Sequence, residues 1–359
     1  MHSTSFKRRA ESRRSGISLL ELLVILAIVS VILALLLPAI GTARTAARKV
    51  QCQNNLKNIA IALLAFHDSH RRFPASGLFH DPDDSPGEAR HSWAVTILPH
   101  LDQGNLHERW TFDKSFSDPV NEPLAATRVP VFLCPIDISR SRKPHGDLSY
   151  AVNGGWGFTT KTGTGVRDCP IDWQRRFPDL NGDGQVCSGD DAVDDLDRGI
   201  LKKSGMYFPE NSNPGGTVRH HSLNMIRDGA SQTFLVGENV RTGFDPKSSS
   251  GNFANPSPLL TTFFVGIPCP AARCSDGSVN HELSNAAENA INSGLWAAEG
   301  SSPVPNSFHE GGVNMAYADG RVSFLNESID GGVYAALASP QGTDLDDTPL
   351  RQSVVSDLR

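Results

Sequence analysis

The chain has 359 residues, a formal net charge of −6 and 39% hydrophobic residues. This length gives room for one or two soluble domains, and the mildly acidic balance excludes a protein that binds nucleic acid through a strongly basic surface. The 32 glycines and 23 prolines, together with only 7% aromatic residues, favour a loop-rich, mostly β body with many turns.

The first element in chain order is a basic leader, residues 1–16, followed by an apolar segment, residues 17–40. About 20 apolar residues are enough to cross a bilayer. A secretory signal peptide has a shorter apolar core of about 7–15 residues, with small residues marking a cleavage site after it. The segment therefore predicts a transmembrane helix, and the basic leader predicts a cytoplasmic N-terminus with the rest of the chain in a periplasm.

One acidic residue, Glu21, lies inside this apolar segment. A carboxylate at the centre of a membrane helix costs about 2.5–3.5 kcal/mol, so its presence suggests a functional site. Gly16, Ile17 and Glu21 together resemble the cleavage site of type IV prepilins and pseudopilins. The resemblance implies that a prepilin peptidase cuts between Gly16 and Ile17, that the new N-terminus is methylated, and that Glu21 is the fifth residue of the mature chain. A simple membrane anchor is the alternative interpretation.

Residues 17–66 are predicted to form one long helix, with a kink at Pro38, its only proline. Beyond Pro38 the apolar residues recur at helical spacing on one face, which predicts that this half packs on a soluble domain. The residues expected on that face are Cys52, Leu56, Ile59, Ala60 and Leu63. A helix that spans a membrane with one half and packs on a domain with the other resembles the architecture of a pilin subunit.

Residues 67–340 are predicted to form the periplasmic domain, and the polar, acidic residues 341–359 a frayed tail. Strand segments are expected near residues 129–135, 149–154 and 233–238. A β-hairpin is predicted over residues 313–325, turning at Asp319-Gly320. A two-residue turn there would pair Tyr317 with Val322.

All six cysteines follow the membrane segment, and an even number in an oxidising compartment suggests disulfides. Six cysteines allow 15 pairings, so the connectivity is a hypothesis: two local loops and one bond from the long helix to the body. Zinc is the alternative, but no Cys-x-x-Cys pair exists and the spacings do not match common zinc sites. The hypothetical pairs are Cys169–Cys187, Cys269–Cys274 and Cys52–Cys134.

An insert over residues 159–205 contains a stretch with the spacing of an EF-hand calcium loop. Hard cations such as Ca²⁺ prefer oxygen ligands, and Gly184 falls at the sharp turn of the loop. Cys187 and Asp190 depart from the EF-hand pattern, and an aspartate at the last position resembles dockerin-type loops. A solvated acidic loop is the alternative. The predicted structural Ca²⁺ ligands are Asp179, Asn181, Asp183, the Gln185 carbonyl and Asp190.

Several motifs, taken in order, resemble the DUF1559 family of prepilin-like proteins. They are the prepilin-like start, residues 51–59 and 66–68, Arg72-Phe73-Pro74, Phe132-Leu133-Cys134-Pro135, residues 226–238, and a His-x9-Asp-Gly segment formed by His309, Asp319 and Gly320. The resemblance covers nearly the whole chain except the insert. It implies an envelope protein and no particular chemistry.

No catalytic constellation is apparent in the sequence. The serines lack the Gly-x-Ser-x-Gly context of a hydrolase, and no Rossmann fingerprint or phosphate-binding loop is found. His309 and Asp319 could be an acid–base pair, but an aspartate at a turn is explained by its own backbone hydrogen bonds. We therefore do not expect an enzyme.

The expected fold is α+β and pilin-like, with a long N-terminal transmembrane helix packed on an antiparallel sheet with loop insertions. The expected function is that of a type IV pilin or type II secretion pseudopilin. Its expected partners are a prepilin peptidase, other pilin-like subunits or secretion machinery, and the lipid bilayer. The expected location is a bacterial inner membrane, crossed once, with surface exposure after assembly. The alternative is a membrane-tethered glycan-binding module that stacks sugars on tryptophans, for which the candidates are Trp93, Trp110, Trp156, Trp173 and Trp296.

Overall fold

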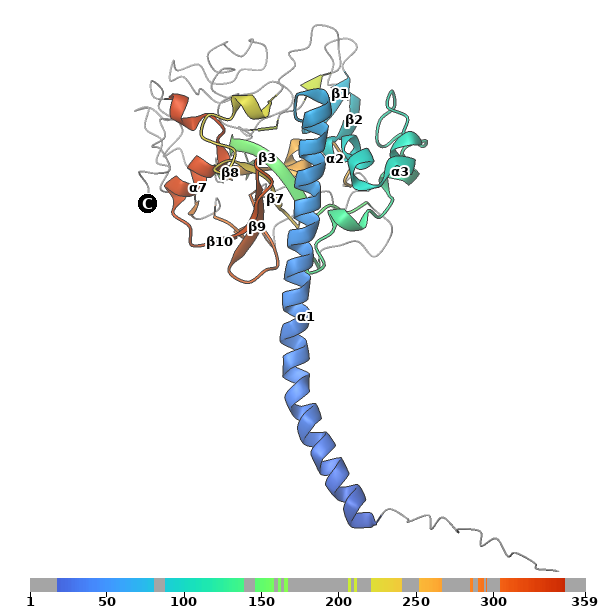
Figure 1. Cartoon of the computed structure of the whole chain (residues 1–359). Helices are drawn as coiled ribbons and strands as arrows, with labels where there is room; N and C mark the ends of the chain where they lie inside the picture. Colours follow the sequence, from blue (N-terminus) through green and yellow to red (C-terminus); the bar gives the residue numbers. More distant parts are fainter. Residues whose placement is uncertain are drawn as a thin grey trace, which may run out of the picture. The chain divides into compact units, whose positions relative to one another are not determined.

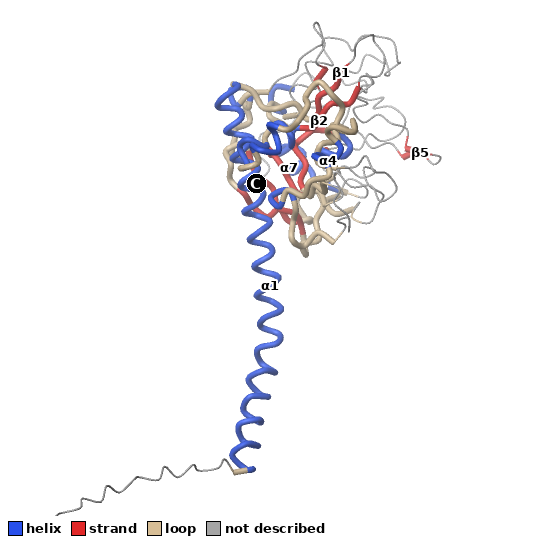
Figure 2. The backbone as a smooth tube through the Cα atoms, turned by 90° about the vertical axis from the view of Figure 1, so that its right-hand side faces the viewer, coloured by secondary structure: helices blue, strands red, loops and turns tan. Residues whose placement is uncertain are grey.

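A computed structural model of the chain shows an α+β protein (Figure 1). Helices, strands and loops are distinguished by colour along the backbone in Figure 2. The chain divides into two units, Met1–Ala47 and Arg48–Arg359. The described residues are 18–80, 88–138, 146–157, 161–162, 165–166, 206–207, 210–211, 221–240, 252–266, 285–286, 290–293, 295 and 304–345.

Helix α1 spans Leu19–His70 and continues through Pro38, four residues further than the end predicted at residue 66. It bends in its N-terminal half (Figure 1). The apolar side chains from Leu19 to Ile40 that the structure describes are exposed. Among the described helices, this one is long and apolar enough to cross a membrane.

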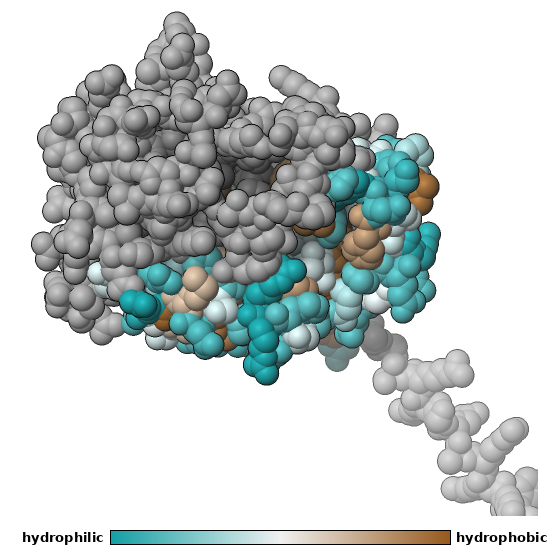
Figure 3. Space-filling model, turned by 90° about the horizontal axis from the view of Figure 1, so that it is seen from above, coloured by the Kyte–Doolittle hydropathy of each residue, from teal (hydrophilic) through white to brown (hydrophobic). Residues whose placement is uncertain are grey.

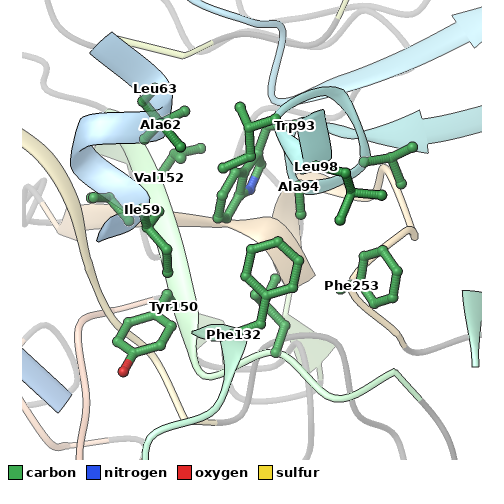
Figure 4. Close-up of a cluster of buried hydrophobic side chains, with 14 of the residues drawn as sticks. Ile59, Ala62, Leu63, Trp93, Ala94, Leu98, Phe132, Tyr150, Val152 and Phe253 are labelled. Carbon is green, nitrogen blue, oxygen red and sulfur yellow. The ribbon is translucent and has the colours of Figure 1, made fainter. Parts of the chain in front are cut away.

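The second half of α1 belongs to the unit Arg48–Arg359 and carries the predicted apolar face. Cys52, Leu56, Ile59, Ala60 and Leu63 are all fully buried, which confirms the helical periodicity read from the sequence. Figure 4 shows Ile59, Ala62 and Leu63 beside Val152 and Trp93 in the core. Burial of this face therefore fixes the second half of the helix to the body.

The main sheet has five strands in the order β10-β9-β7-β3-β8. It is mixed, because β3 pairs with β8 in parallel while the other neighbours are antiparallel. The prediction of an antiparallel sheet is therefore correct for four strands and wrong for β8, which follows β7 in the chain but crosses to the far side of β3 and pairs with it in parallel. The bounds are β3 Tyr150–Gly157, β7 Phe234–Glu238, β8 Thr262–Gly266, β9 Gly312–Tyr317 and β10 Val322–Asn326.

The two faces of this sheet contribute to different hydrophobic cores. Val152, Val236 and Ala316 belong to the cluster that includes the buried face of α1. Ala151, Met315 and other residues on the opposite side pack with helix α7, Gly331–Ala338. Successive side chains of a strand point to opposite faces, and this alternation separates the two cores, except in β7, where a register shift places the consecutive residues Leu235 and Val236 in the same cluster.

Smaller elements complete the body. β1 (Gly77–His80), β2 (Glu88–Ser92) and β6 (Glu210–Asn211) form a three-stranded sheet, and β4 (Lys161–Thr162) pairs with β5 (Gly165–Val166). Short helical segments are α2 Trp93–Thr96, η1 Leu98–Leu101, α3 Gly104–Glu108, α4 Glu122–Ala125, η2 Pro130–Phe132, η3 Leu223–Met225, α6 Pro258–Thr261 and η6 Gly342–Leu345. The strand expected near residues 129–135 is therefore wrong, since this segment contains the helical turn η2, which begins at Pro130.

The tail predicted at residues 341–359 begins in an ordered conformation. Asp228 accepts hydrogen bonds from the Gly342 amide, at 2.7 Å, and from the Thr343 hydroxyl. Arg227 and Asp228 also donate their amides to the Pro340 carbonyl. These bonds fix the chain immediately after α7, so residues 341–343 are not frayed; residues 346–359 lie outside the described part.

The predicted hairpin is present as β9 and β10, but its register differs from the expectation by one residue. Val322 pairs with Ala316, and Phe324 pairs with Asn314. The turn contains three residues, 318–320, because the Gly320 amide donates to the Tyr317 carbonyl and Gly320 has a φ of 80°. A three-residue turn that ends in a left-handed glycine is a common hairpin connection. Phe324 therefore lies on the α1 side of the sheet, where Lys49 stacks on its ring at 3.5 Å.

This geometry predicts that Gly320→Ala lowers the free energy of unfolding by about 1–2 kcal/mol, because a Cβ atom disfavours the left-handed region. Gly320→Asn should cost less, since asparagine tolerates that conformation. The matched control is Gly104→Ala, where an added Cβ meets no atom within 4 Å. Denaturant unfolding of the detergent-solubilised chain measures all three. Equal effects of the two alanine variants would contradict the assigned turn.

Candidate functional site

The candidate site is centred on Glu238, the last residue of β7, whose side chain is fully buried. Its Oε2 atom accepts a hydrogen bond from the Asn314 amide at 2.8 Å. Its Oε1 atom accepts from the Asn314 side chain at 3.1 Å and lies 3.1 Å from His309 Nε2. A carboxylate can be held away from water only when donors of this kind replace its hydration.

His309 reaches Glu238 from the loop that precedes β9. The Ser307 hydroxyl accepts the His309 amide at 3.1 Å and donates to the Gly312 carbonyl at 2.7 Å. These two bonds close the loop locally and hold the histidine in place. The side chains of His309 and Glu238 are 3% and 0% exposed, so water competes little for the contact between them.

Helix α1 forms the next part of the site. Gln53 donates its side-chain amide to the Asn314 side chain at 3.0 Å. Cys52, the residue before it, forms a disulfide with Cys134, as predicted. The Cys134 Sγ atom lies 3.7 Å from His309 Nε2. The site therefore joins four segments that are distant in sequence: α1, the loop after η2, the end of β7 and the loop before β9.

Tyr150 lies next to the carboxylate, because it is paired with Glu238 across β3 and β7. Complete burial, and secondarily the negative charge of Glu238, raises the pKa of Tyr150 well above its usual value. The phenol therefore stays neutral and donates to the Cys52 carbonyl at 3.3 Å. This bond connects the central sheet to α1 beside the disulfide.

The structure does not form an acid–base pair from His309 and Asp319. His309 contacts Glu238, whereas Asp319 is exposed in the turn between β9 and β10. The Asp319 side chain accepts the Arg321 amide at 2.8 Å, as expected for a turn aspartate. Gly320 supplies the left-handed turn residue, and its carbonyl accepts a hydrogen bond from Lys57 of α1. His309, Asp319 and Gly320 therefore do not form a single site.

Sequence reasoning missed the roles of Glu238 and Asn314. Both are polar residues in strands whose other members are mainly apolar, and both are fully buried. A buried polar residue within an apolar strand indicates a hydrogen-bonded partner, but the partner cannot be identified before the fold is known.

Glu21 also has an interaction that was not predicted. The Ser18 amide donates to the Glu21 carboxylate at 2.9 Å, and the Glu21 amide donates to the Ser18 hydroxyl at 3.2 Å. This reciprocal pair is a capping box at the start of α1. Its signal, a serine followed three residues later by a glutamate, is present in the sequence. Gly16 and Ile17 lie outside the described residues.

The other predicted sites also lie outside the described residues. These are the calcium-loop residues Asp179, Asn181, Asp183, Gln185 and Asp190, and the cysteines 169, 187, 269 and 274. Within the described part of the chain, Cys52, Cys134, Glu238 and His309 are a group whose ligand atoms all lie within 4.8 Å of one another. The zinc interpretation was set aside because no two cysteines have a local zinc-site spacing, yet the fold brings together donors from distant segments.

Residues 41–332 match the model of a family described as protein of unknown function, DUF1559. The match covers more than half of the chain, so the protein belongs to the DUF1559 family, as the sequence motifs indicated. Comparison with curated proteins found no match, and comparison with solved structures found none either. The family and the apolar N-terminal helix are compatible with a membrane-anchored envelope protein.

The geometry predicts that His309→Ala lowers the free energy of unfolding by about 1–3 kcal/mol, because it removes one hydrogen-bond partner of the buried Glu238 carboxylate. Adding Glu238→Gln should recover part of this loss, since the amide carries no charge. A double-mutant cycle by denaturant unfolding measures the coupling. Losses that add within about 0.5 kcal/mol would show that the two side chains do not interact energetically.

Proposed function

We propose that this protein is a pseudopilin-like envelope protein that is processed by a prepilin peptidase and assembles through the first half of α1. The observation that carries the proposal is an apolar helical segment, residues 19–40, with Glu21 as its single charged residue. The described apolar side chains of this segment are exposed. Such a surface needs lipid or other apolar helices around it.

The second half of α1 supports the same proposal. Its apolar face is buried, and the Cys52–Cys134 disulfide and the Gln53–Asn314 hydrogen bond attach it to the body. One helix thus has a half suited to a bilayer and a half committed to a soluble domain. A stable disulfide also fits an oxidising compartment, in agreement with an inner-membrane protein that has a cytoplasmic N-terminus and a periplasmic body.

In the assembled state we propose that Glu21 pairs with the N-terminal amine of a neighbouring subunit. The pair would offset the cost of placing either charge alone in an apolar environment. The capping box gives Glu21 a second role within its own chain. An experiment must therefore distinguish the effect of the Glu21 charge from the effect of the helix cap.

Glu21→Gln makes this separation, because glutamine can still form a capping box but carries no charge. We expect it to be cleaved after Gly16, as shown by intact-mass and peptide mass spectrometry, and to lose assembly, measured by cross-linking of neighbouring subunits in membranes. The matched control is Ser18→Ala, which removes one bond of the cap and keeps the charge. It should assemble.

Two results would count against the proposal. Normal assembly of Glu21→Gln would reduce Glu21 to a capping residue. A chain that retains residues 1–16 in its native host would reduce the segment to an ordinary membrane anchor.

The glycan-binding alternative receives less support from the structure. Stacking of sugars needs exposed aromatic faces, but Trp93, Trp110 and Trp156 are buried. Trp173 and Trp296 lie outside the described residues. The face of the body shown in Figure 3 is mainly hydrophilic among its coloured residues, with hydrophobic residues scattered between them.

The insert is proposed to bind a structural Ca²⁺ ion through Asp179, Asn181, Asp183, Gln185 and Asp190. We expect Asp183→Ala to abolish the heat of Ca²⁺ binding in calorimetric titration of the detergent-solubilised chain, because a hard cation needs its oxygen ligands. The control is Asp319→Ala, which removes an exposed carboxylate elsewhere and should leave the heat unchanged. No heat for the unmodified chain would reject the ion.

A further inference from the structure

We propose that the Cys52–Cys134 pair has a second state: as free thiols, it binds a thiophilic divalent cation, Zn²⁺, together with His309 and Glu238. In this state the two sulfurs, His309 Nε2 and Glu238 Oε1 are the four ligand atoms. This inference does not rest on the proposed role in assembly.

The donor atoms already lie near the spacing that zinc requires. Zn–S bonds of about 2.3 Å and Zn–N or Zn–O bonds of about 2.0–2.2 Å place tetrahedral ligand atoms about 3.3–3.8 Å apart. His309 Nε2 lies 3.7 Å from Cys134 Sγ and 3.1 Å from Glu238 Oε1. All four donors lie within 4.8 Å of one another. Breaking the S–S bond and separating the sulfurs would therefore create a four-ligand site with small side-chain movements.

Neighbouring residues form hydrogen bonds with the proposed ligand residues. In many metal sites, such bonds orient the ligands around the ion. The Asn314 amide binds Glu238 Oε2, which leaves Oε1 directed toward His309. Gln53 in turn binds the Asn314 side chain, and Ser307 holds the His309 backbone. Each ligand residue is also buried, so water would compete little for the ion.

Charge favours an ion in the free-thiol state. With Zn²⁺ bound, two thiolates and one carboxylate would place three negative charges around the ion, which compensates most of this charge in the buried space. Zn²⁺ displaces one proton from each thiol and uses neutral His309 as a ligand. Thiolate and imidazole ligands favour zinc over calcium or magnesium, which prefer oxygen.

The two states exclude each other, because the same sulfur electrons form either the S–S bond or the metal bonds. The chain is synthesised with free thiols, so zinc binding during folding needs no reductant. Conversion to the oxidised state transfers two electrons from the two thiolates to a disulfide of a dithiol oxidant. The oxidant takes up two protons from water and becomes a dithiol, the Cys52–Cys134 bond forms, and the Zn²⁺ ion is released.

The test uses the full chain in detergent, unfolded and reduced with a phosphine, then refolded with Co²⁺ as a spectroscopic substitute for Zn²⁺. We expect a near-ultraviolet thiolate-to-cobalt absorption band that one equivalent of Zn²⁺ removes. The band should be absent from Cys52→Ser/Cys134→Ser and retained in the matched control Cys169→Ser/Cys187→Ser. Asn314→Ala should weaken Zn²⁺ binding by about 10–100-fold, as loss of an outer partner does.

Near-ultraviolet circular dichroism of each refolded chain is compared with that of the oxidised protein, so that a variant that has not refolded is identified. A second measurement avoids substitution altogether: the oxidised, unmodified chain should show no thiolate band. The proposal is overturned if the reduced chain gives no band, if the band persists without Cys52 and Cys134, or if the oxidised chain binds Co²⁺ with the same spectrum.

Discussion

The structure depends on the complete burial of one carboxylate. Glu238 ends the central strand β7 with no exposure to solvent, and such a group is tolerated only where donors surround it. Satisfying it requires the backbone of β9, the loop that carries His309 and, through Gln53, helix α1. Three parts of the chain that are far apart in sequence, namely α1, β7 and residues 309–314, must therefore be correctly placed at once. This requirement gives the network a role in specifying the fold, beyond the energy of any single hydrogen bond.

The hydrophobic packing of the body also depends on the position of helix α1. The sheet buries one face under the second half of α1 and the other under α7. Apolar packing alone would let a helix slide or rotate on a sheet, because it is not directional. The Gln53–Asn314 bond, the Asn55 bond to the Leu133 carbonyl and the Lys57 bond to the Gly320 carbonyl all come from α1. They fix the position of the helix along the sheet, and the disulfide makes that position covalent.

Local features of the sequence predicted the local features of this fold. Helical spacing identified the buried face of α1, and alternation with a turn signal located the hairpin. The one-residue error in the hairpin register arose because Asp319-Gly320 is compatible with both two- and three-residue turns. The parallel pairing of β3 with β8 has no local signal. Family membership was predicted from several motifs in order, and the family match confirms it.

The candidate site was harder to predict because its members have no fixed spacing. His309 was noticed for its distance from Asp319, but its contact is Glu238, 71 residues away in the chain. Cys52 and Cys134 were paired correctly, with a separation of 82 residues, by assigning the other four cysteines to local loops. The place where this pair meets Glu238 and His309 became visible only in three dimensions.

The capping box of α1 has a consequence for the proposed cleavage after Gly16. Both of its members, Ser18 and Glu21, follow the Gly16–Ile17 bond. Cleavage at that bond would leave the two reciprocal hydrogen bonds in the product, with Ile17 still preceding Ser18. The residues that cap the start of the helix therefore all follow this bond. Removal of the leader would change the charge at the membrane surface without requiring the helix to find a new beginning.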